Sequence, residues 1–339
     1  MDKNALNQMM RALRIHEYGN PSLVRVDNVA IPEPNPGEVR IRVKAAGLNN
    51  SDLQTTYGTY RGYGHRGLPH ILGQEASGIV DLVGKEVTEF SPGMRVVGHV
   101  KGGFAEYAIA PANELLALPE SISFEVGASL PIAYLTASMA LVRKAKLKPG
   151  EWVLIHPGSG GVGTAAIQLT KLLGGKAIST AGTAKKVAYL QELGADFTFD
   201  YSKSDLVAEL KRITEDAGIQ VALDGGGKVT LPQCLEAIAD GGRIISYGYT
   251  TGIEATIPLI KLIGRNVKLF GIALWFNDDY QASWKTVRDL VITAVAKGNI
   301  QPAIDDVVGL EGVAEALLRL EQRGVMGKII VVPKLNPNI

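Results

Sequence analysis

A length of 339 residues favours two domains, and a composition of 46% hydrophobic and 20% charged residues excludes a largely disordered chain. The net charge of +1 argues against a nucleic acid or an acidic membrane as the partner. The single cysteine, Cys234, excludes a disulfide within the chain and a cysteine-rich metal site, and we expect a cytoplasmic protein.

The first part of the chain is predicted to be rich in β-strands. Residues 1–10 are polar and are interpreted as an arm or an added extension outside the fold. Beyond them, no apolar run has the length of a membrane span. Short apolar or alternating runs, separated by turns such as Pro36-Gly37, predict strands up to about residue 130. The expected strands are 11–15, 39–43, 76–83, 95–99 and 105–109.

After Pro131 apolar strands alternate with amphipathic helices. This pattern predicts a parallel sheet covered on both faces, and six strands match the two halves of a dinucleotide-binding fold. The expected strands are 152–156, 176–180, 197–200, 221–224, 243–247 and 267–272. The expected helices are 133–144, 163–173, 184–193, 206–214, 231–238 and 281–297. A last strand, 328–333, is expected to return to the first domain.

A glycine-rich turn follows the expected strand 152–156. It reads Gly158-Ser159-Gly160-Gly161-Val162-Gly163 and leads directly into a helix. In this context the first glycine permits a tight turn, the second lets the backbone approach a pyrophosphate, and the third lets the helix pack on the strand. The helix N-terminus adds free N–H groups and a partial positive charge. The motif therefore predicts a bound dinucleotide and an oxidoreductase.

The end of the next strand indicates which dinucleotide is bound. An NAD site usually carries a carboxylate about 20 residues after the turn, where it binds the ribose 2′-hydroxyl. The segment 179–186 contains no carboxylate, but it contains hydroxyl residues and two lysines, Lys185 and Lys186. Such groups suit a 2′-phosphate. We therefore predict NADPH over NADH, although the lysines would also suit the solvated face of a helix.

Eight segments resemble, in their order and spacing, those of the medium-chain dehydrogenase/reductase superfamily, and most closely its zinc-free quinone oxidoreductase branch. They are Gly47–Asp52, Leu72–Glu75, Pro92–Val96, Gly103–Tyr107, Leu130–Ala137, Gly160–Gly163, Leu193–Asp196 and Gly327–Ile330. The resemblance covers residues 11–333. It implies an α/β protein with a GroES-like β-rich catalytic domain, residues 1–133 and 276–339, and a Rossmann domain, residues 134–275. It also implies a homodimer joined at strand 267–272.

The resemblance also bears on metal binding. Zinc alcohol dehydrogenases of this superfamily hold their catalytic zinc with Cys and His. In this chain Asn49 stands at the first Cys position and Gln74 at the His position, so we expect no metal. Without that Lewis acid the implied chemistry is hydride transfer to an already polarised small molecule, a quinone or an α,β-unsaturated carbonyl. Solvent can supply the proton.

Three residues are expected near the reacting atoms. By resemblance Asn49 lies close to the nicotinamide, where its amide could bind either the acceptor carbonyl or the ribose. Gln54 stands where the branch often has a tyrosine, and Tyr57 is expected to take part of that role. Asp52 is expected to fix the loop. The segment 54–67, rich in tyrosine and glycine, is interpreted either as a lid over the acceptor or as an exposed loop.

The resemblance also assigns a set of cofactor-binding residues. Thr136 is expected to approach the nicotinamide carboxamide, Lys186 the 2′-phosphate, and Tyr201 the adenosine side. The implied contacts are Asn49, Thr136, Gly158, Ser159, Gly160, Gly161, Val162, Gly163, Gly182, Thr183, Lys186, Tyr201, Gly225, Gly226, Tyr247 and Lys328.

Two alternatives to quinone or enone reduction remain open at this stage. The first is a zinc-free enoyl-thioester reductase of the same superfamily, which would need a basic groove for coenzyme A phosphates. The second is a nucleotide-binding protein with little catalysis, such as a crystallin-type relative or an RNA-binding protein. The near-neutral charge weighs against RNA. NADPH oxidation in the presence of a quinone or enone would discriminate between these possibilities.

Overall fold

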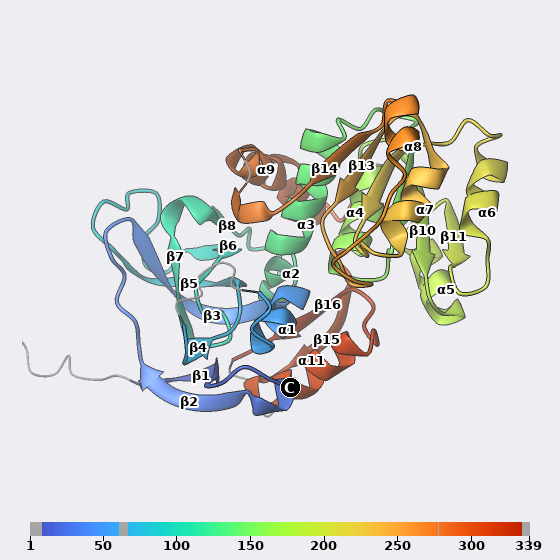
Figure 1. The fold of residues 1–339 in the computed structure, drawn as a ribbon. Helices are drawn as coiled ribbons and strands as arrows, with labels where there is room; N and C mark the ends of the chain where they lie inside the picture. The colour runs from blue at the N-terminus through green and yellow to red at the C-terminus, as the bar shows by residue number, and fades with distance from the viewer. Residues whose placement is uncertain (1–8, 61–66, 277, 334–339) are drawn as a thin grey trace, which may run out of the picture. The chain divides into compact units, whose positions relative to one another are not determined.

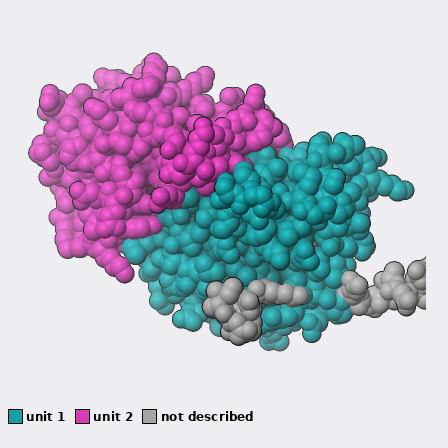
Figure 2. Space-filling view, turned by 180° about the vertical axis from the view of Figure 1, so that it is seen from behind, with its two compact units in different colours: residues 1–132, 302–339 teal, residues 133–301 magenta. Residues whose placement is uncertain are grey.

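A computed structural model describes residues 9–60, 67–276 and 278–333. The chain divides into two compact units (Figure 2): unit 1 is residues 1–132 with 302–339, and unit 2 is residues 133–301. The second boundary lies later than the predicted residue 275. Asp279 forms ion pairs with Arg143 and Lys144, and the Gln301 N–H donates to Gln168 Oε1 over 2.8 Å. These contacts hold residues 278–301 to unit 2.

Unit 1 is built on two β-sheets (Figure 1). The smaller sheet has the order β2 (Arg25–Ala30), β1 (Met9–Ile15), β4 (His70–Ile71). The larger has the order β15 (Ile304–Val308), β16 (Lys328–Val331), β3 (Glu38–Leu48), β5 (Glu75–Val83), β6 (Arg95–His99), β8 (Leu115–Ala117), and β7 (Tyr107–Pro111) also pairs with β3. The helices are α1 (Asn50–Thr56), α2 (Phe124–Ala128) and α11 (Val313–Glu321), with 3-10 turns at Pro21–Leu23, Ala112–Glu114 and Leu310–Gly312.

Both ends of the described chain belong to unit 1. Strand β16 pairs antiparallel with β3, with Ile330 opposite Gly47, as predicted for a returning last strand. The expectation that residues 1–10 lie outside the fold is wrong for Met9 and Met10. Both residues begin β1, where they pair with Ala30 and Val29 of β2, and Met10 is buried.

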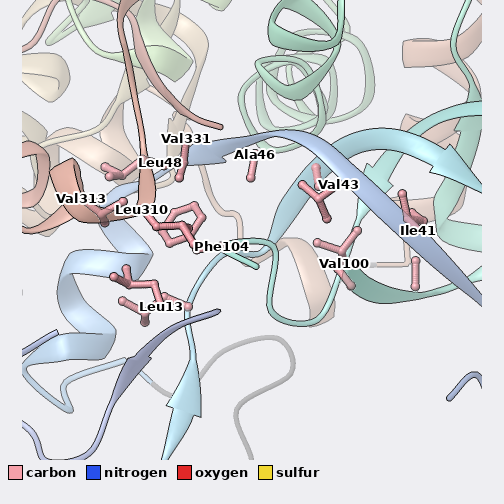
Figure 3. Packing of buried hydrophobic residues seen from close by; sticks show 14 of the residues in the cluster. Leu13, Ile41, Val43, Ala46, Leu48, Val100, Phe104, Leu310, Val313 and Val331 are labelled. Carbon is pink, nitrogen blue, oxygen red and sulfur yellow. The ribbon is translucent and has the colours of Figure 1, made fainter. Parts of the chain in front are cut away.

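The core of unit 1 gathers around Phe104, which is fully buried. Its ring lies among Leu13, Leu310 and Val331, which come from the first strand and from the C-terminal segment (Figure 3). Gly73 lies against the Phe104 backbone with a φ of 95°, so a side chain there would meet both strain and a clash. This packing fixes the turn that leads into β5, which begins at Glu75.

Unit 2 contains a six-stranded parallel sheet (Figure 1). Its order is β11 (Phe197–Asp200), β10 (Lys176–Ala181), β9 (Trp152–His156), β12 (Ile219–Asp224), β13 (Ile238–Ser246), β14 (Lys268–Gly271). This is the order 3-2-1-4-5-6 of a doubly wound nucleotide-binding fold, as the sequence pattern predicted. The order reverses between β9 and β12, so the glycine-rich turn after β9 lies at the switch point.

Helices cover this sheet on both faces. They are α4 (Gly161–Leu172), α5 (Ala184–Glu192), α6 (Leu206–Ile213), α7 (Thr230–Ala237) and α8 (Leu259–Gly264). Further along come a 3-10 turn (Leu274–Phe276), α9 (Tyr280–Thr286), a π-helix (Val287–Ile292) and α10 (Thr293–Ala296). Val153, Leu154 and Ile155 point alternately to opposite faces, and all three are fully buried. This double burial explains why the strand is a continuous apolar run.

One long helical segment crosses the first boundary between the units. It consists of α3 (Pro131–Ser138) followed by a π-helix (Met139–Lys144). The sequence predicted a single helix over 133–144, and the structure adds the π-helical second half. This second half carries Arg143 and Lys144, which pair with Asp279.

Candidate active site

The glycine-rich turn has the geometry of a dinucleotide cradle. Helix α4 begins at Gly161, and its N-cap residue Gly160 supplies no side chain to its N–H groups. A Cβ on Gly163 would overlap the Gly158 carbonyl, whereas a Cβ on Gly160 would meet no atom within 4 Å. Gly163 is therefore required by the fold itself. Gly160 leaves open space in front of the helix N-terminus, a kind of position that suits a bound anion.

The end of β10 and the end of β11 form a second part of the site. The Tyr201 hydroxyl would lie 2.7 Å from a Cβ on Gly182, so the glycine makes room for the tyrosine. Thr183 caps α5, and its hydroxyl accepts from the Lys186 N–H over 3.3 Å. That hydroxyl can still donate its own proton. Lys186 is half-buried in the first turn of α5, next to these groups.

A buried histidine network supports this part of the site. His156 Nδ1 lies 2.5 Å from Thr180 Oγ1, and His156 Nε2 lies 2.8 Å from Gln233 Oε1. The imidazole also packs edge-on against the Tyr201 ring, with centroids 5.9 Å apart. Burial lowers the pKa of His156, against the raising effects of Gln233 and Asp224. A neutral His156 therefore links β9 and β10 to Tyr201. The sequence did not reveal this role.

The turn after β12 is held by a buried carboxylate. Asp224 Oδ1 accepts from the backbone N–H groups of Gly226 and Gly227 over 3.1 and 3.0 Å. Asp224 Oδ2 accepts from the Ser246 hydroxyl over 2.8 Å, which ties β12 to β13. The Tyr247 hydroxyl lies against Gly225, where it would be 2.7 Å from a Cβ. The predicted residues Gly225, Gly226 and Tyr247 thus lie together at one edge of the sheet.

In unit 1 Asn49 contacts both members of a buried ion pair, Lys328 and Glu75. Lys328 Nζ donates to Glu75 Oε1 over 2.5 Å, to Asn49 Oδ1 over 2.7 Å and to the Leu48 carbonyl over 3.1 Å. Asn49 Nδ2 donates to Glu75 Oε1 over 2.7 Å and to the Gly47 carbonyl over 3.2 Å. Glu75 is fully buried and Lys328 is 4% exposed.

This arrangement changes two expectations. Lys328 was expected to contact the cofactor, but its ammonium is buried and donates three hydrogen bonds within unit 1, one of them to Asn49. Both N–H groups of the Asn49 amide are also engaged, which leaves only spare acceptor capacity on Oδ1. Asn49 can therefore accept from a hydroxyl, such as one of a ribose, but it cannot donate to an acceptor carbonyl without losing a bond.

Asp52 holds the loop that carries Asn49. Its Oδ2 accepts from the Asn49 N–H over 2.9 Å, and its Oδ1 accepts from the Gly73 N–H over 3.2 Å. Burial raises the pKa of Asp52 to about 7, against the lowering effects of these two N–H groups and of Lys328. The carboxyl connects the start of α1 to the turn before β5, in line with the structural role expected for it.

The remaining predicted residues are placed as follows. Gln54 lies half-buried on α1, and Tyr57 follows the helix, where its hydroxyl donates to Glu321 Oε1 over 2.8 Å. Thr136 is buried on α3. Ser159, Gly161 and Val162 belong to the glycine-rich turn and the first turn of α4. Within the proposed lid over 54–67, residues 61–66 lie outside the described part of the chain.

The donor set does not suit a zinc ion. Among the described residues no group of three or more His, Cys, Asp or Glu side chains is placed to hold a metal. Around Asn49 the ammonium of Lys328 already supplies the cation that pairs with Glu75. A divalent ion there would face a positive charge and an amide whose N–H groups are committed.

Among the described residues no helix has the length and apolar character needed to cross a membrane.

Comparisons with known proteins support this fold and site. Residues 35–120 match the alcohol dehydrogenase GroES-like domain family, and residues 161–292 match the zinc-binding dehydrogenase family. The pig quinone oxidoreductase is 33% identical over 329 residues, which cover 96% of this chain and 98% of that protein. Together these matches define a medium-chain dehydrogenase/reductase.

Solved structures agree with this assignment. The Escherichia coli quinone oxidoreductase complexed with NADPH is 28% identical, with a TM-score of 0.88 over 95% of this chain and all of that one. An NAD-dependent alcohol dehydrogenase is 32% identical, with a TM-score of 0.86 over 96% of this chain and all of that one. The chain belongs to the quinone oxidoreductase branch of the medium-chain dehydrogenase/reductase superfamily, which confirms the predicted family and fold class.

Proposed function

We propose that this oxidoreductase uses NADPH to reduce a quinone or an α,β-unsaturated carbonyl without a metal ion. The observation that carries the proposal is the combination of two features. A glycine-rich turn with open space at Gly160 suits a pyrophosphate, and residues 182–186, which follow β10, contain no carboxylate where an NAD site usually has one. The relatives that carry the name quinone oxidoreductase support the acceptor class.

The choice of NADPH over NADH depends on the residues after β10, because the solved relatives include both an NADPH complex and an NAD-dependent enzyme. A carboxylate at this position would repel a 2′-phosphate, whereas Lys186 attracts it and Thr183 can donate a hydrogen bond. Tyr201, supported by His156, offers a flat face and a hydroxyl to the adenosine side. We therefore assign the 2′-phosphate to Lys186.

The chain's own groups bind and orient the reactants. NADPH supplies the hydride when bound. The N-terminus of α4 neutralises the pyrophosphate charge, and Gly160 permits its close approach. Thr136 approaches the nicotinamide carboxamide, and Gln54 and Tyr57 are assigned to the acceptor side. Asn49 accepts a hydrogen bond from a ribose hydroxyl, because its amide protons are already committed.

The same cluster supports a reaction that is independent of zinc. The positions that hold zinc in the alcohol dehydrogenases carry Asn49 and Gln74, and the Lys328 ammonium pairs with Glu75 beside them. A quinone or conjugated enone accepts hydride at a carbon remote from its oxygen, so it needs orientation more than a Lewis acid. A hydride transfer that needs no Lewis acid therefore agrees with a set of side chains that does not suit zinc.

The test is NADPH oxidation, followed by absorbance, with a panel of quinones, short enones and crotonyl-coenzyme A. We expect turnover with quinones or enones, a catalytic efficiency at least tenfold lower with NADH, and unchanged rates after dialysis against a chelator. Comparable efficiency with NADH would contradict the cofactor assignment. Loss of activity after dialysis, restored by zinc, would contradict the metal-free reaction. Turnover of the thioester alone would indicate the enoyl-thioester reductase instead.

A matched pair of variants isolates the 2′-phosphate site. Lys186→Ala is expected to weaken NADPH binding about 10- to 100-fold, which corresponds to one charge-assisted hydrogen bond, and to leave NADH binding unchanged. Lys185→Ala removes the neighbouring, exposed lysine and is expected to change both affinities less than threefold. Fluorescence titration with each dinucleotide measures these affinities. An equal loss for NADH in Lys186→Ala would refute the assignment.

We also propose a homodimer that forms at the edge of the Rossmann sheet. β14 is the last strand of that sheet among the described residues. The adjacent helix α8 exposes Leu259, Ile260 and Ile263, and Ile260 is 75% exposed. Unpaired strand groups beside an apolar surface favour pairing with a second copy. Light scattering should report a dimer for the wild type and a monomer for Ile260→Glu, and a monomeric wild type would refute the proposal.

A further inference from the structure

Three aromatic side chains in unit 2 form a ladder to which the proposed function assigns no role. The ring centroids of Trp275 and Tyr280 lie 5.8 Å apart with the planes inclined by 52°. Those of Tyr280 and Trp284 lie 6.4 Å apart in an edge-to-face arrangement at 87°. Trp284 is 4% exposed, whereas Tyr280 and Trp275 are half-buried. Such contacts are attractive, so the buried Trp284 restrains the two outer rings.

The ladder begins shortly after the carboxyl end of β14, in the half of the sheet that we infer for the nicotinamide. A dinucleotide lies across the carboxyl edge of a doubly wound sheet, with its pyrophosphate at the switch point between β9 and β12. The adenosine side is assigned to β10 and β11 by Gly182 and Tyr201, so the nicotinamide half lies over β12 to β14. Trp275 follows the carboxyl end of β14, three strand spacings or about 14 Å from β9.

A double ion pair connects the ladder to the helix that carries Thr136. Asp279 directly precedes Tyr280, and it binds Arg143 over 3.1 Å and Lys144 over 2.9 Å. Both cations lie on the π-helix that continues α3, the helix of Thr136. π-Helical segments are rare and occur often at functional sites. One continuous helical segment therefore holds both the residue assigned to the nicotinamide carboxamide and the loop that presents the aromatic rings.

We propose that Trp275, supported by Tyr280 and Trp284, determines acceptor specificity by stacking on the acceptor and favouring planar, ring-fused acceptors such as naphthoquinones over small aliphatic enones. This inference rests on the proposed function, because it concerns the acceptor of the same reaction. An indole gains most from a flat aromatic partner that overlaps it in an offset stack. A small enone lacks the area for such overlap, so Trp275 contributes little to its binding.

The experiment measures acceptor binding without turnover. The protein is saturated with NADP⁺, which cannot deliver a hydride. Isothermal titration calorimetry of this protein–NADP⁺ complex gives dissociation constants for 1,4-naphthoquinone and 2-cyclohexen-1-one. We expect Trp275→Ala to weaken naphthoquinone binding about tenfold and cyclohexenone binding less than twofold. Trp275→Phe keeps a flat ring and is expected to stay within threefold of the wild type. The matched control is Trp152→Ala, because Trp152 lies at the amino end of β9, whereas Trp275 follows the carboxyl end of β14 in the same sheet.

The outcomes separate this inference from the proposed function. Unchanged naphthoquinone binding in Trp275→Ala, an equal loss in Trp152→Ala, or a wild type that does not prefer naphthoquinone would each overturn it. If the expected binding pattern appears but NADPH reduces no acceptor, the proposed function fails and the stacking role stands. If quinones are turned over and their KM values are the same in Trp275→Ala, the proposed function stands and the stacking role fails.

Discussion

Replacing Lys328 with methionine tests whether the buried ion pair organises unit 1. The substitution removes the ammonium and keeps most of the side-chain volume. Among the described residues, Glu75, which has no exposed surface, would keep the Asn49 amide and the Ile132 N–H as donors, each at 2.7 Å. Removing one partner of a buried pair costs about 3–5 kcal/mol, because the other charge stays buried. We expect a loss of that size in the free energy of unfolding.

Denaturation by urea, followed by circular dichroism, measures this loss. The three tryptophans, Trp152, Trp275 and Trp284, all belong to unit 2, so their fluorescence reports separately on that unit and should change little. The control is Lys101→Met, because Lys101 pairs with Glu38 over 2.7 Å but its side chain is 29% exposed. This more exposed pair is expected to contribute less than about 1 kcal/mol.

A double-mutant cycle with Glu75→Gln completes the test. The neutral glutamine no longer needs a cation, so the double variant should be about 2 kcal/mol more stable than the sum of the single losses predicts. We also expect kcat to fall in Lys328→Met, because the Asn49 amide loses the donor that orients it. Additive losses, or a Lys328→Met variant within 1 kcal/mol of the wild type, would refute the reasoning.

Two further predictions concern unit 2. Gly163→Ala should lower both thermal stability and NADPH affinity, because the new Cβ would overlap the Gly158 carbonyl. Gly160→Ala should weaken NADPH binding at least tenfold and leave the melting temperature unchanged, because a Cβ there meets no atom of the protein within 4 Å. Equal melting temperatures for the two variants would contradict this prediction. Arg243 binds Glu151 through two bonds of 2.9 and 2.7 Å, and against the effect of burial this lowers the pKa of Glu151 below 4.5. A carboxyl group whose pKa is lowered in the folded state stabilises the fold fully at a pH above its usual pKa, and this contribution is lost as the pH falls. The difference in the free energy of unfolding between the wild type and Arg243→Met should therefore shrink below about pH 4.5. A constant difference from about pH 3 to 7 would exclude this ion pair as its cause.

The sequence by itself determined the features that depend on neighbouring residues. The strands 152–156, 197–200 and 95–99 have the predicted bounds, because continuous or alternating apolar runs next to turn residues specify them locally. The glycine-rich turn was equally clear, because the tight turn, the open face and the close packing depend on residues within one six-residue motif. The fold class and the family followed from these local signals and their order.

Only the tertiary structure decided how distant side chains combine. Lys328 and Glu75 are 253 positions apart, and nothing in the local pattern of either indicates that they pair. The commitment of the Asn49 amide follows from that pairing. The histidine network at Tyr201 arises in the same way, because His156 contacts Thr180 and Gln233, which are 24 and 77 positions away in the sequence. The glycine-rich turn could therefore be predicted from the sequence. The contacts that hold Asn49 and Tyr201 could not, because they depend on tertiary packing.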